Sequence, residues 1–355
     1  MKKIVVSTFN YSNSNYGALL QSCALSRFLS DLGYDVFYIT IKNRNHNRSI
    51  KTNLKIWFKK IVTIRKNQLF QKRKKKFRAF AEKTQNQIVF DSEKALFQSP
   101  PKADVYLSGS DQVWNPVNIH ADLFLAYTSD DAKRISYAAS MGHETIPAGA
   151  EARFAKYITR YQSISVREDS MLEIIRKYTD LPITQNIDPV FLMTRGQWEE
   201  LEEPYKNIRF DRYILAYILW WDHSYNEEIQ KLKQRTGLPI VSVSTGNLNK
   251  IPAEQVIYDA SPGEFLYLMH NAAYVVTSSF HGTAMSILYH KDALAVTSRD
   301  KPNRVQSLMR HFGIPYSDKI FMDHKQVDFE KIDQIIRQDQ EQAKTYLVHS
   351  IEDNR

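Results

Sequence analysis

The chain of 355 residues contains a single cysteine, Cys23. One cysteine excludes a disulfide framework and a zinc site built on several thiolates. Because Cys23 falls at an apolar position of a helical pattern, we interpret it as a small core residue rather than a nucleophile.

Long apolar runs are also missing. No stretch of 18 apolar residues is present, so the sequence predicts no membrane-spanning helix. The residues from Met1 to Ser7 lead directly into a strand pattern and lack the apolar stretch of a signal peptide. We therefore expect a cytoplasmic protein.

Three enzyme motifs are absent, namely G-x-x-x-x-G-K-[ST], a full G-x-G-x-x-G and H-E-x-x-H. Their absence disfavours P-loop kinases, simple dinucleotide enzymes and zinc proteases of that class. The sequence also has no convincing cluster of metal ligands. We expect neither a metal ion nor a bound cofactor.

The net charge of +9 comes from one segment. Residues 42–78 contain 15 Lys and Arg and no Asp or Glu, whereas the rest of the chain holds 33 basic and 39 acidic residues. A basic amphipathic helix with Trp and Phe is typical of a membrane surface. The predicted membrane-facing residues are Trp57, Phe58, Lys59 and Lys60. The alternative is a helix packed on the first domain with a solvated basic face, and nucleic-acid binding fits less well.

Strand and helix patterns alternate along the chain. A strand over 4–9, a helix over 16–32 that ends at Gly33, and a strand over 36–41 form a βαβ unit, which is typical of a parallel sheet. A second series begins after about residue 204. We predict two Rossmann-like α/β domains, residues 1–200 and 205–355, with the basic segment inserted at about 43–85 and a C-terminal helix in the second domain. Ligands in such folds bind beyond the carboxyl ends of the strands.

The sharpest local signal follows the predicted strand 274–278. Ser279 precedes His281, Gly282 and Thr283, which lie where a helix opens. Free N–H groups at a helix N-terminus attract an anion, Gly282 permits close approach, and His281 can donate a proton near neutral pH. The alternative is a capped helix with a packed histidine.

Two arginines are candidates for binding the same anion. Arg167 follows the predicted strand 164–166, and its planar guanidinium suits a carboxylate or phosphate. The structural alternative is that Glu168 is simply its ion-pair partner. Arg304 precedes another predicted helix and can complete an anion pocket, although a solvated charged loop explains it equally well.

Residues after two other strands are candidates for a sugar site. Asp111 follows Ser110 and can accept a hydrogen bond from a sugar hydroxyl or act as a base, while Trp114 can stack on a sugar face. The alternative is an Asp cap with a core Trp. Asn15 and Gly17 lie in a turn that resembles a phosphate-binding turn, unless Asn15 simply caps the helix.

Six pieces in this order together resemble the polysaccharide pyruvyl transferase family. They are Asn15-Tyr16-Gly17-Ala18-Leu19-Leu20-Gln21, Gly109-Ser110-Asp111-Gln112-Val113-Trp114-Asn115, Ile135-Ser136-Tyr137-Ala138-Ala139-Ser140, Ser165-Val166-Arg167-Glu168, Asp188-Pro189 and Ser279-Phe280-His281-Gly282. Met141 stands after Ala-Ser where the family more often has Phe.

The resemblance implies a glycosyltransferase-B-like fold, with two Rossmann-like domains that face a cleft. It implies phosphoenolpyruvate as the donor and co-substrate, a pyruvate ketal on a hexose as the product, and Arg167 and His281 as anion-binding residues. It also implies a saccharide acceptor that is often linked to polyprenyl diphosphate. An anionic lipid carrier would suit a basic segment at the inner face of the cell membrane.

We therefore expect a pyruvyl transferase of surface or capsular polysaccharide biosynthesis, with His281 as the catalytic acid and Asp111 as the tentative base. The expected donor-binding residues are Arg167, Ser279, His281, Gly282, Thr283 and Arg304. The expected acceptor-binding residues are Asn15, Gly17, Ser110, Asp111 and Trp114. Two alternatives stay open: a nucleotide-sugar glycosyltransferase of the same fold, and a non-catalytic membrane-associated assembly protein.

Overall fold

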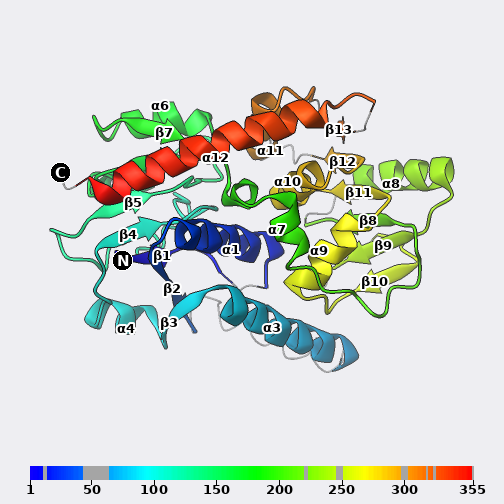
Figure 1. Cartoon of the computed structure of the whole chain (residues 1–355), viewed down its shortest axis with the longest axis horizontal. Coiled ribbons are helices and arrows are strands. Elements are labelled where there is room, and N and C mark those ends of the chain that lie inside the picture. The colour runs from blue at the N-terminus through cyan, green and yellow to red at the C-terminus, as the bar shows by residue number, and fades with distance from the viewer. Residues whose placement is uncertain are drawn as a thin grey trace.

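The computed structural model describes residues 1–10, 14–42, 64–219, 223–244, 251–296, 303–316, 319–322 and 325–353. Two open sheets lie side by side, each with helices around it (Figure 1). No helix in the described ranges is long and apolar enough to cross a bilayer.

The first sheet has the strand order β3-β2-β1-β4-β5, and all of its strands are parallel. This is the strand order of one half of a Rossmann fold. The strands are β1 (Lys3–Ser7), β2 (Asp35–Ile41), β3 (Asn86–Phe90), β4 (Val105–Ser108) and β5 (Arg134–Ser136). A parallel pair, β6 (Ile164–Val166) and β7 (Ile183–Gln185), continues beyond β5 through isolated bridges.

The second sheet has the order β10-β9-β8-β11-β12-β13, in which β13 alone is antiparallel among the described strands. Its strands are β8 (Ile214–Tyr217), β9 (Ile240–Val243), β10 (Gln255–Ile257), β11 (Tyr274–Thr277), β12 (Ala293–Val296) and β13 (Lys319–Met322). The fold is therefore two Rossmann-like α/β units, as predicted.

Helices connect the strands in both units. Those of the first unit are α1 (Tyr16–Asp31), α3 (Ile64–Thr84), α4 (Glu93–Gln98), α5 (Glu151–Ile158) and α6 (Ser170–Arg176). Between the units lie the short helices η3 (Pro189–Leu192) and α7 (Arg195–Glu199). Those of the second unit are α8 (His223–Thr236), α9 (Pro262–His270), α10 (Phe280–Leu288) and α11 (Asn303–His311). One further 3₁₀ turn, η2 (Ala148–Ala150), precedes α5.

One apolar core runs through both units. Leu19 and Leu20 of α1 belong to the same buried cluster as Phe265 of α9 and Met285 of α10. Cys23 lies on this face of α1, where burial raises the pKa of its thiol to about 12. The α1 helix thus packs against elements of both units.

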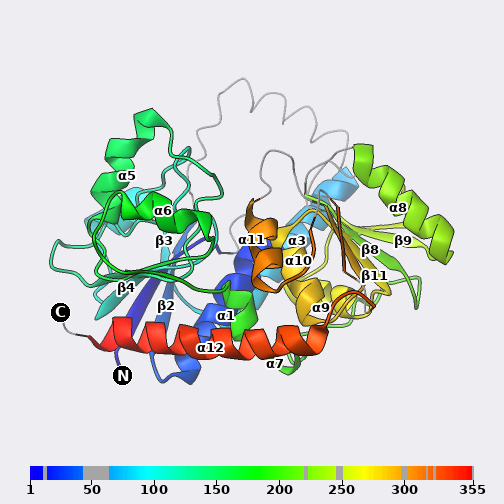
Figure 2. The same cartoon turned by 90° about the horizontal axis from the view of Figure 1, so that it is seen from above.

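The final helix, α12 (Phe329–Glu352), runs along both units (Figures 1 and 2). Lys2 Nζ donates to the carbonyl of Ile351 at 3.0 Å, and Tyr346 Oη donates to the carbonyl of Ser136 at 2.8 Å. The sequence assigned this helix to the second domain alone, but its last turns also pack on the first. Amphipathic periodicity does not say which partner a helix face covers.

Candidate functional site

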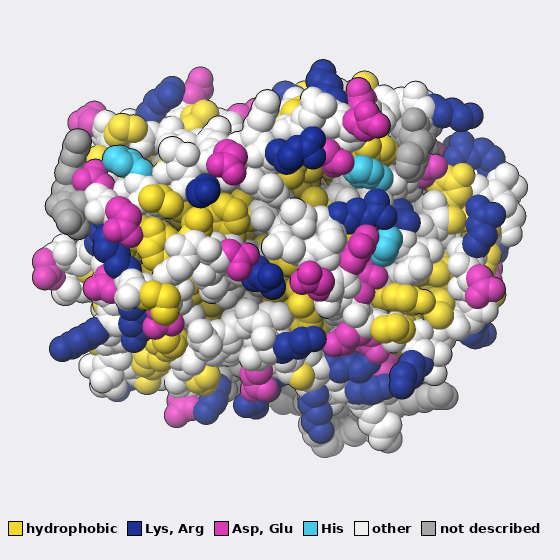
Figure 3. All heavy atoms as spheres, viewed as in Figure 1, with side chains coloured by type: hydrophobic (Ala, Val, Ile, Leu, Met, Phe, Trp, Pro, Cys, Tyr) yellow, Lys and Arg dark blue, Asp and Glu magenta, His cyan; other side chains and the backbone are white. Residues whose placement is uncertain are grey.

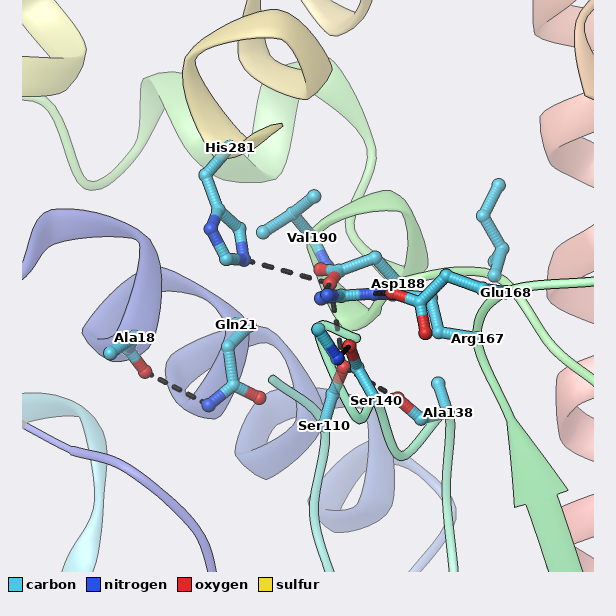
Figure 4. A network of polar contacts seen from close by, with 12 residues as sticks. Ala18, Gln21, Ser110, Ala138, Ser140, Arg167, Glu168, Asp188, Val190 and His281 are labelled. Atoms are coloured by element: carbon cyan, nitrogen blue, oxygen red, sulfur yellow. Dashed lines mark hydrogen bonds and ion pairs between the residues drawn. The ribbon is translucent and has the colours of Figure 1, made fainter. Parts of the chain in front are cut away.

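Polar residues from several strand ends converge between the two units. Arg167 directly follows β6, Asp188 follows β7, and His281 lies in the first turn of α10 after β11. Figure 4 shows these three side chains meeting next to α1. The structure thus brings together two of the residues predicted for the donor, Arg167 and His281.

Arg167 is held by two carboxylates. Its Nη1 donates to Asp188 Oδ2 at 2.5 Å, and its Nε donates to Glu168 Oε1 at 3.0 Å. The ring of Phe280 lies 4.3 Å from the guanidinium carbon. All three ionic side chains are buried, and Nη2 of Arg167 has no hydrogen-bond partner in the described part of the chain. Glu168 therefore does pair with Arg167, as the structural alternative predicted, yet one guanidinium nitrogen remains for a ligand.

The charges of this cluster support one another. Burial alone would raise the pKa of Asp188, but His281 and Arg167 outweigh it and hold that pKa below its usual range. Burial likewise opposes the charge of Arg167, but Glu168 and Asp188 raise its pKa above the usual value. A buried carboxylate that keeps its charge needs these partners, because desolvation is costly without them.

His281 lies between Asp188 and α1. Its Nε2 is 3.5 Å from Asp188 Oδ2. On the other side, Gly17 approaches so closely that a Cβ built there would fall 2.1 Å from Nδ1. The residue is buried, so the imidazole is enclosed by groups of both units. Gly17 makes room for the histidine, and its predicted contact with the acceptor stays a prediction.

A cavity of about 270 Å³ lies beside Arg167. Its lining includes Arg304 and Ser307 of α11, Asp188, and Gln342 of α12. With its oxygen turned toward Arg304, the amide of Gln112 accepts from that guanidinium at 3.2 and 3.3 Å. Burial and the neighbouring Arg167 lower the pKa of Arg304. Two predicted donor arginines thus share one cavity between the units.

The predicted helix start at Ser279 exists, but its hydroxyls serve the helix itself. Ser279 Oγ accepts from the N–H of Gly282 at 3.3 Å, and Thr283 Oγ1 donates to the carbonyl of Ser279 at 3.0 Å. A Cβ at Gly282 would fall 2.3 Å from Thr277 Oγ1. Ser279, Gly282 and Thr283 therefore position His281, and their contact with a donor remains a prediction.

The loop after β4 supports the cluster from behind. Ser110 is fully buried. Its Oγ donates to the carbonyl of Ala138 at 2.9 Å and lies at hydrogen-bond distance, 3.4 Å, from the acceptor Asp188 Oδ2. This burial contradicts its predicted contact with an acceptor. Asp111 has the left-handed φ of 68° and is buried, and its role as a base remains a prediction.

Two other acceptor predictions also change. Trp114 is 0% exposed, stacks on Phe124, and donates through Nε1 to Tyr161 Oη at 3.3 Å. The predicted stacking of Trp114 on a sugar is therefore wrong, and the core alternative holds. Asn15 is exposed and makes no side-chain cap bond to α1, so the capping alternative is wrong for this residue.

The predicted membrane-facing residues Trp57, Phe58, Lys59 and Lys60 lie outside the described residues. The later part of the basic segment forms α3, which lies against the second unit (Figure 1). There Lys72 pairs with Asp259 and Lys76 with Glu264, each at 2.6 Å. These lysines therefore join the two units.

Sequence reasoning left Asp188 out of the site. Asp188 was noted only as part of the Asp188-Pro189 motif, and in the structure its Oδ1 accepts from the N–H of Val190 at 3.1 Å. Its second oxygen holds Arg167 and faces His281. The signal that could have found it was its position after a strand, in the same kind of place as the other candidates.

The chain has a glycosyltransferase-B-like fold, with a polar site between two Rossmann-like domains. Residues 15–300 match the family described as polysaccharide pyruvyl transferase. The chain belongs to this family of transferases, and the resemblance that the motifs indicated is confirmed.

Similar solved structures include sugar-nucleotide enzymes. S. aureus MnaA in its UDP co-structure has a TM-score of 0.55 at 10% identity, over 99% of this chain and 91% of that chain. The UDP-GlcNAc 2-epimerase of Methanocaldococcus jannaschii has a TM-score of 0.52 at 13% identity, over 94% and 91%. The UDP-GlcNAc 2-epimerase of Neisseria meningitidis bound to UDP-GlcNAc has a TM-score of 0.50 at 11% identity, over 98% of this chain and 94% of that chain. At such identities the likeness shows the fold alone. No curated protein matches the chain significantly.

Proposed function

We propose that this transferase moves the enolpyruvyl group of phosphoenolpyruvate onto a hexose as a ketal and releases phosphate. The observation that carries the proposal is the cavity between the units, where Arg167 and Arg304 come from different domains and share one small space. Two guanidinium groups in one cavity suit a ligand with two anionic groups. Phosphoenolpyruvate has a phosphate and a carboxylate on a three-carbon frame.

The size of the cavity, together with a guanidinium nitrogen of Arg167 that has no partner among the described residues, supports a small anion over a nucleotide sugar. Its volume of about 270 Å³ is below the usual range for a drug-sized ligand, which starts at about 300 Å³. Arg167 has both carboxylate partners on its Nη1 and Nε, which leaves Nη2 for the ligand. Arg304 has only the neutral amide of Gln112 as a hydrogen-bond partner within the described ranges.

The chemistry requires one proton donor and one proton acceptor. Protonation of the donor's methylene carbon makes its central carbon electrophilic, and a sugar hydroxyl attacks that carbon. Loss of phosphate and attack by a second hydroxyl close the ketal. The two hydroxyl protons go to the departing phosphate and to the base that resets the acid. We assign the acid to His281 and the base to Asp111.

The acceptor and its carrier are part of the proposal. We propose a saccharide precursor of a surface or capsular polysaccharide, carried on polyprenyl diphosphate at the inner face of the membrane. Lys74 and Lys75 of the same helix are exposed and form no ion pair with a described residue, so they could meet an anionic surface.

Phosphate release from phosphoenolpyruvate tests the proposal. The full chain is incubated with aryl-tagged and lipid-linked hexosides, and product masses are read in parallel with donor binding. A pyruvylated saccharide that forms in step with phosphate supports the proposal. Failure to bind phosphoenolpyruvate, together with binding of a nucleotide sugar, would assign a glycosyltransferase instead. Vesicle binding without any turnover or donor binding would assign an assembly protein.

A further inference from the structure

The N-terminus of α1 is buried and lacks the usual capping partners among the described residues. Tyr16, Gly17 and Ala18 are buried, the preceding Asn15 makes no side-chain cap bond, and the first turn has no acidic residue. No hydrogen bond from these three N–H groups reaches any other described residue. Unpartnered donors at a buried helix end are costly, and their summed dipole favours a negative charge.

The buried side chain of Arg73 lies next to the same end of α1. Arg73 of α3 is 2% exposed, and its Nη2 donates to the carbonyl of Ser14, two residues before the helix. Its Nη1 donates to the carbonyl of Ser244 at 2.9 Å, and its guanidinium lies 4.8 Å from the ring of Tyr16. Its Nε and the hydroxyl of Ser14 are buried with no hydrogen-bond partner in the described part of the chain.

Among the described residues, Arg73 has no carboxylate partner, whereas its neighbours on α3 have one. Lys72 is paired with Asp259 and Lys76 with Glu264. Arg73, between them on α3, forms no ion pair with any described carboxylate. Carbonyls and aromatic rings compensate a buried charge less fully than a carboxylate does, so a bound anion would stabilise Arg73 further.

We propose that the start of α1 and Arg73 form a phosphoryl-binding subsite, separate from the cavity at Arg167 and Arg304. Asn15, which directly precedes this helix end, is exposed. The subsite lies on the Gly17 side of His281, whereas Arg167 lies on the Asp188 side, as Figure 4 shows for α1 and Asp188. The phosphoryl group comes either from the diphosphate of the acceptor carrier or from the donor, and the position beyond His281 favours the carrier. That choice of source rests on the proposed function; the subsite does not.

Calorimetric titration of the full chain with pyrophosphate, and separately with phosphoenolpyruvate, tests the subsite. Arg73→Gln should weaken pyrophosphate binding by about tenfold or more, because charge-assisted hydrogen bonds are lost. Lys76→Gln is the matched control. It also removes a contact between α3 and the second unit, but the charge that it removes is already paired with Glu264. It should change pyrophosphate affinity by less than about threefold.

Each outcome has a defined meaning. If Arg73→Gln weakens the binding of pyrophosphate alone, and wild type binds both ligands at once, the subsite takes the carrier's diphosphate. If the two ligands compete and the variant weakens the binding of both equally, the subsite takes the donor's phosphate. Equal weakening in Lys76→Gln, or wild-type protein that does not bind pyrophosphate, overturns the subsite. If Arg73→Gln does not fold, Arg73→Lys replaces it, because this variant keeps the positive charge but loses the planar guanidinium. An unchanged pyrophosphate affinity in Arg73→Lys also overturns the subsite. Pyrophosphate binding without phosphoenolpyruvate binding would refute the proposed function and leave the subsite standing.

Discussion

The imidazole of His281 lies directly against the Cα of Gly17, so that a methyl group on Gly17 would fall 2.1 Å from Nδ1. These residues belong to α10 and α1, one from each unit. The absence of a side chain at Gly17 is therefore what allows the two units to meet around the histidine.

Gly17→Ala should consequently lower the free energy of unfolding by about 1–3 kcal/mol, as overpacking does. It should also reduce turnover, because His281 must move. Urea unfolding and phosphate release measure the two effects. Gly196→Ala is the control, since nothing lies within 4 Å of a Cβ there. The double variant Gly17→Ala/His281→Ala should recover stability; additive losses in that variant would contradict the contact.

Asp188→Asn should destabilise the protein by about 3 kcal/mol near neutral pH, because it leaves the buried Arg167 with one carboxylate fewer. The folded pKa of Asp188 lies below its unfolded value near 3.9, so its contribution is complete above about pH 4. That contribution decreases as the pH falls from there through the folded pKa.

Urea unfolding at about pH 7 and about pH 3 measures this loss. The difference between wild type and Asp188→Asn should be smaller at the lower pH. Asp180→Asn, at an exposed position, should show little difference at either pH. A difference for Asp188→Asn that grows on acidification would mean that its charge does not stabilise the cluster.

Arg304→Gln should raise the KM for phosphoenolpyruvate by about tenfold or more, because a guanidinium in the cavity is lost. Steady-state phosphate release measures this change. Arg310→Gln is matched to it on α11, where Arg310 is an exposed partner of Asp169. If both variants lower donor affinity equally, the cavity does not hold the donor.

Trp114→Phe should lower stability by about 2 kcal/mol, since Trp114 fills the core and donates to Tyr161. It should leave donor binding unchanged and the saccharide KM within about twofold. Thermal unfolding and kinetics with the reactive hexoside separate the two effects. A large rise in the saccharide KM without loss of stability would restore the sugar-stacking role.

Periodicity was sufficient for the architecture but less so for the site. Strand and helix alternation predicted both units, since each buried strand and its helix follow from local pattern. It did not find β3, whose half-exposed residues 86–90 follow the long basic helix and join the edge of the sheet. Edge strands of mixed polarity give little signal of their own.

Local motifs identified Arg167, Arg304 and His281 as candidates, but they did not show which side chains these residues contact. A sequence shows that Trp114 follows a strand end, but only packing decides whether an indole is buried or faces a ligand. It likewise cannot show that Asp188 joins Arg167 and His281 across the interface, because those contacts span up to 93 residues of chain. Such long-range pairs depend on how the two units meet.

The most direct test of the account is turnover of phosphoenolpyruvate in deuterated water with the hexoside panel, read by mass spectrometry and phosphate assay. Protonation of the methylene carbon would place one solvent deuterium in the methyl group of each transferred pyruvyl unit. We predict a pyruvylated saccharide with that label, formed in equal amount to the phosphate and lost in His281→Ala. Release of a nucleoside diphosphate from a nucleotide sugar, with no binding of phosphoenolpyruvate, would contradict it.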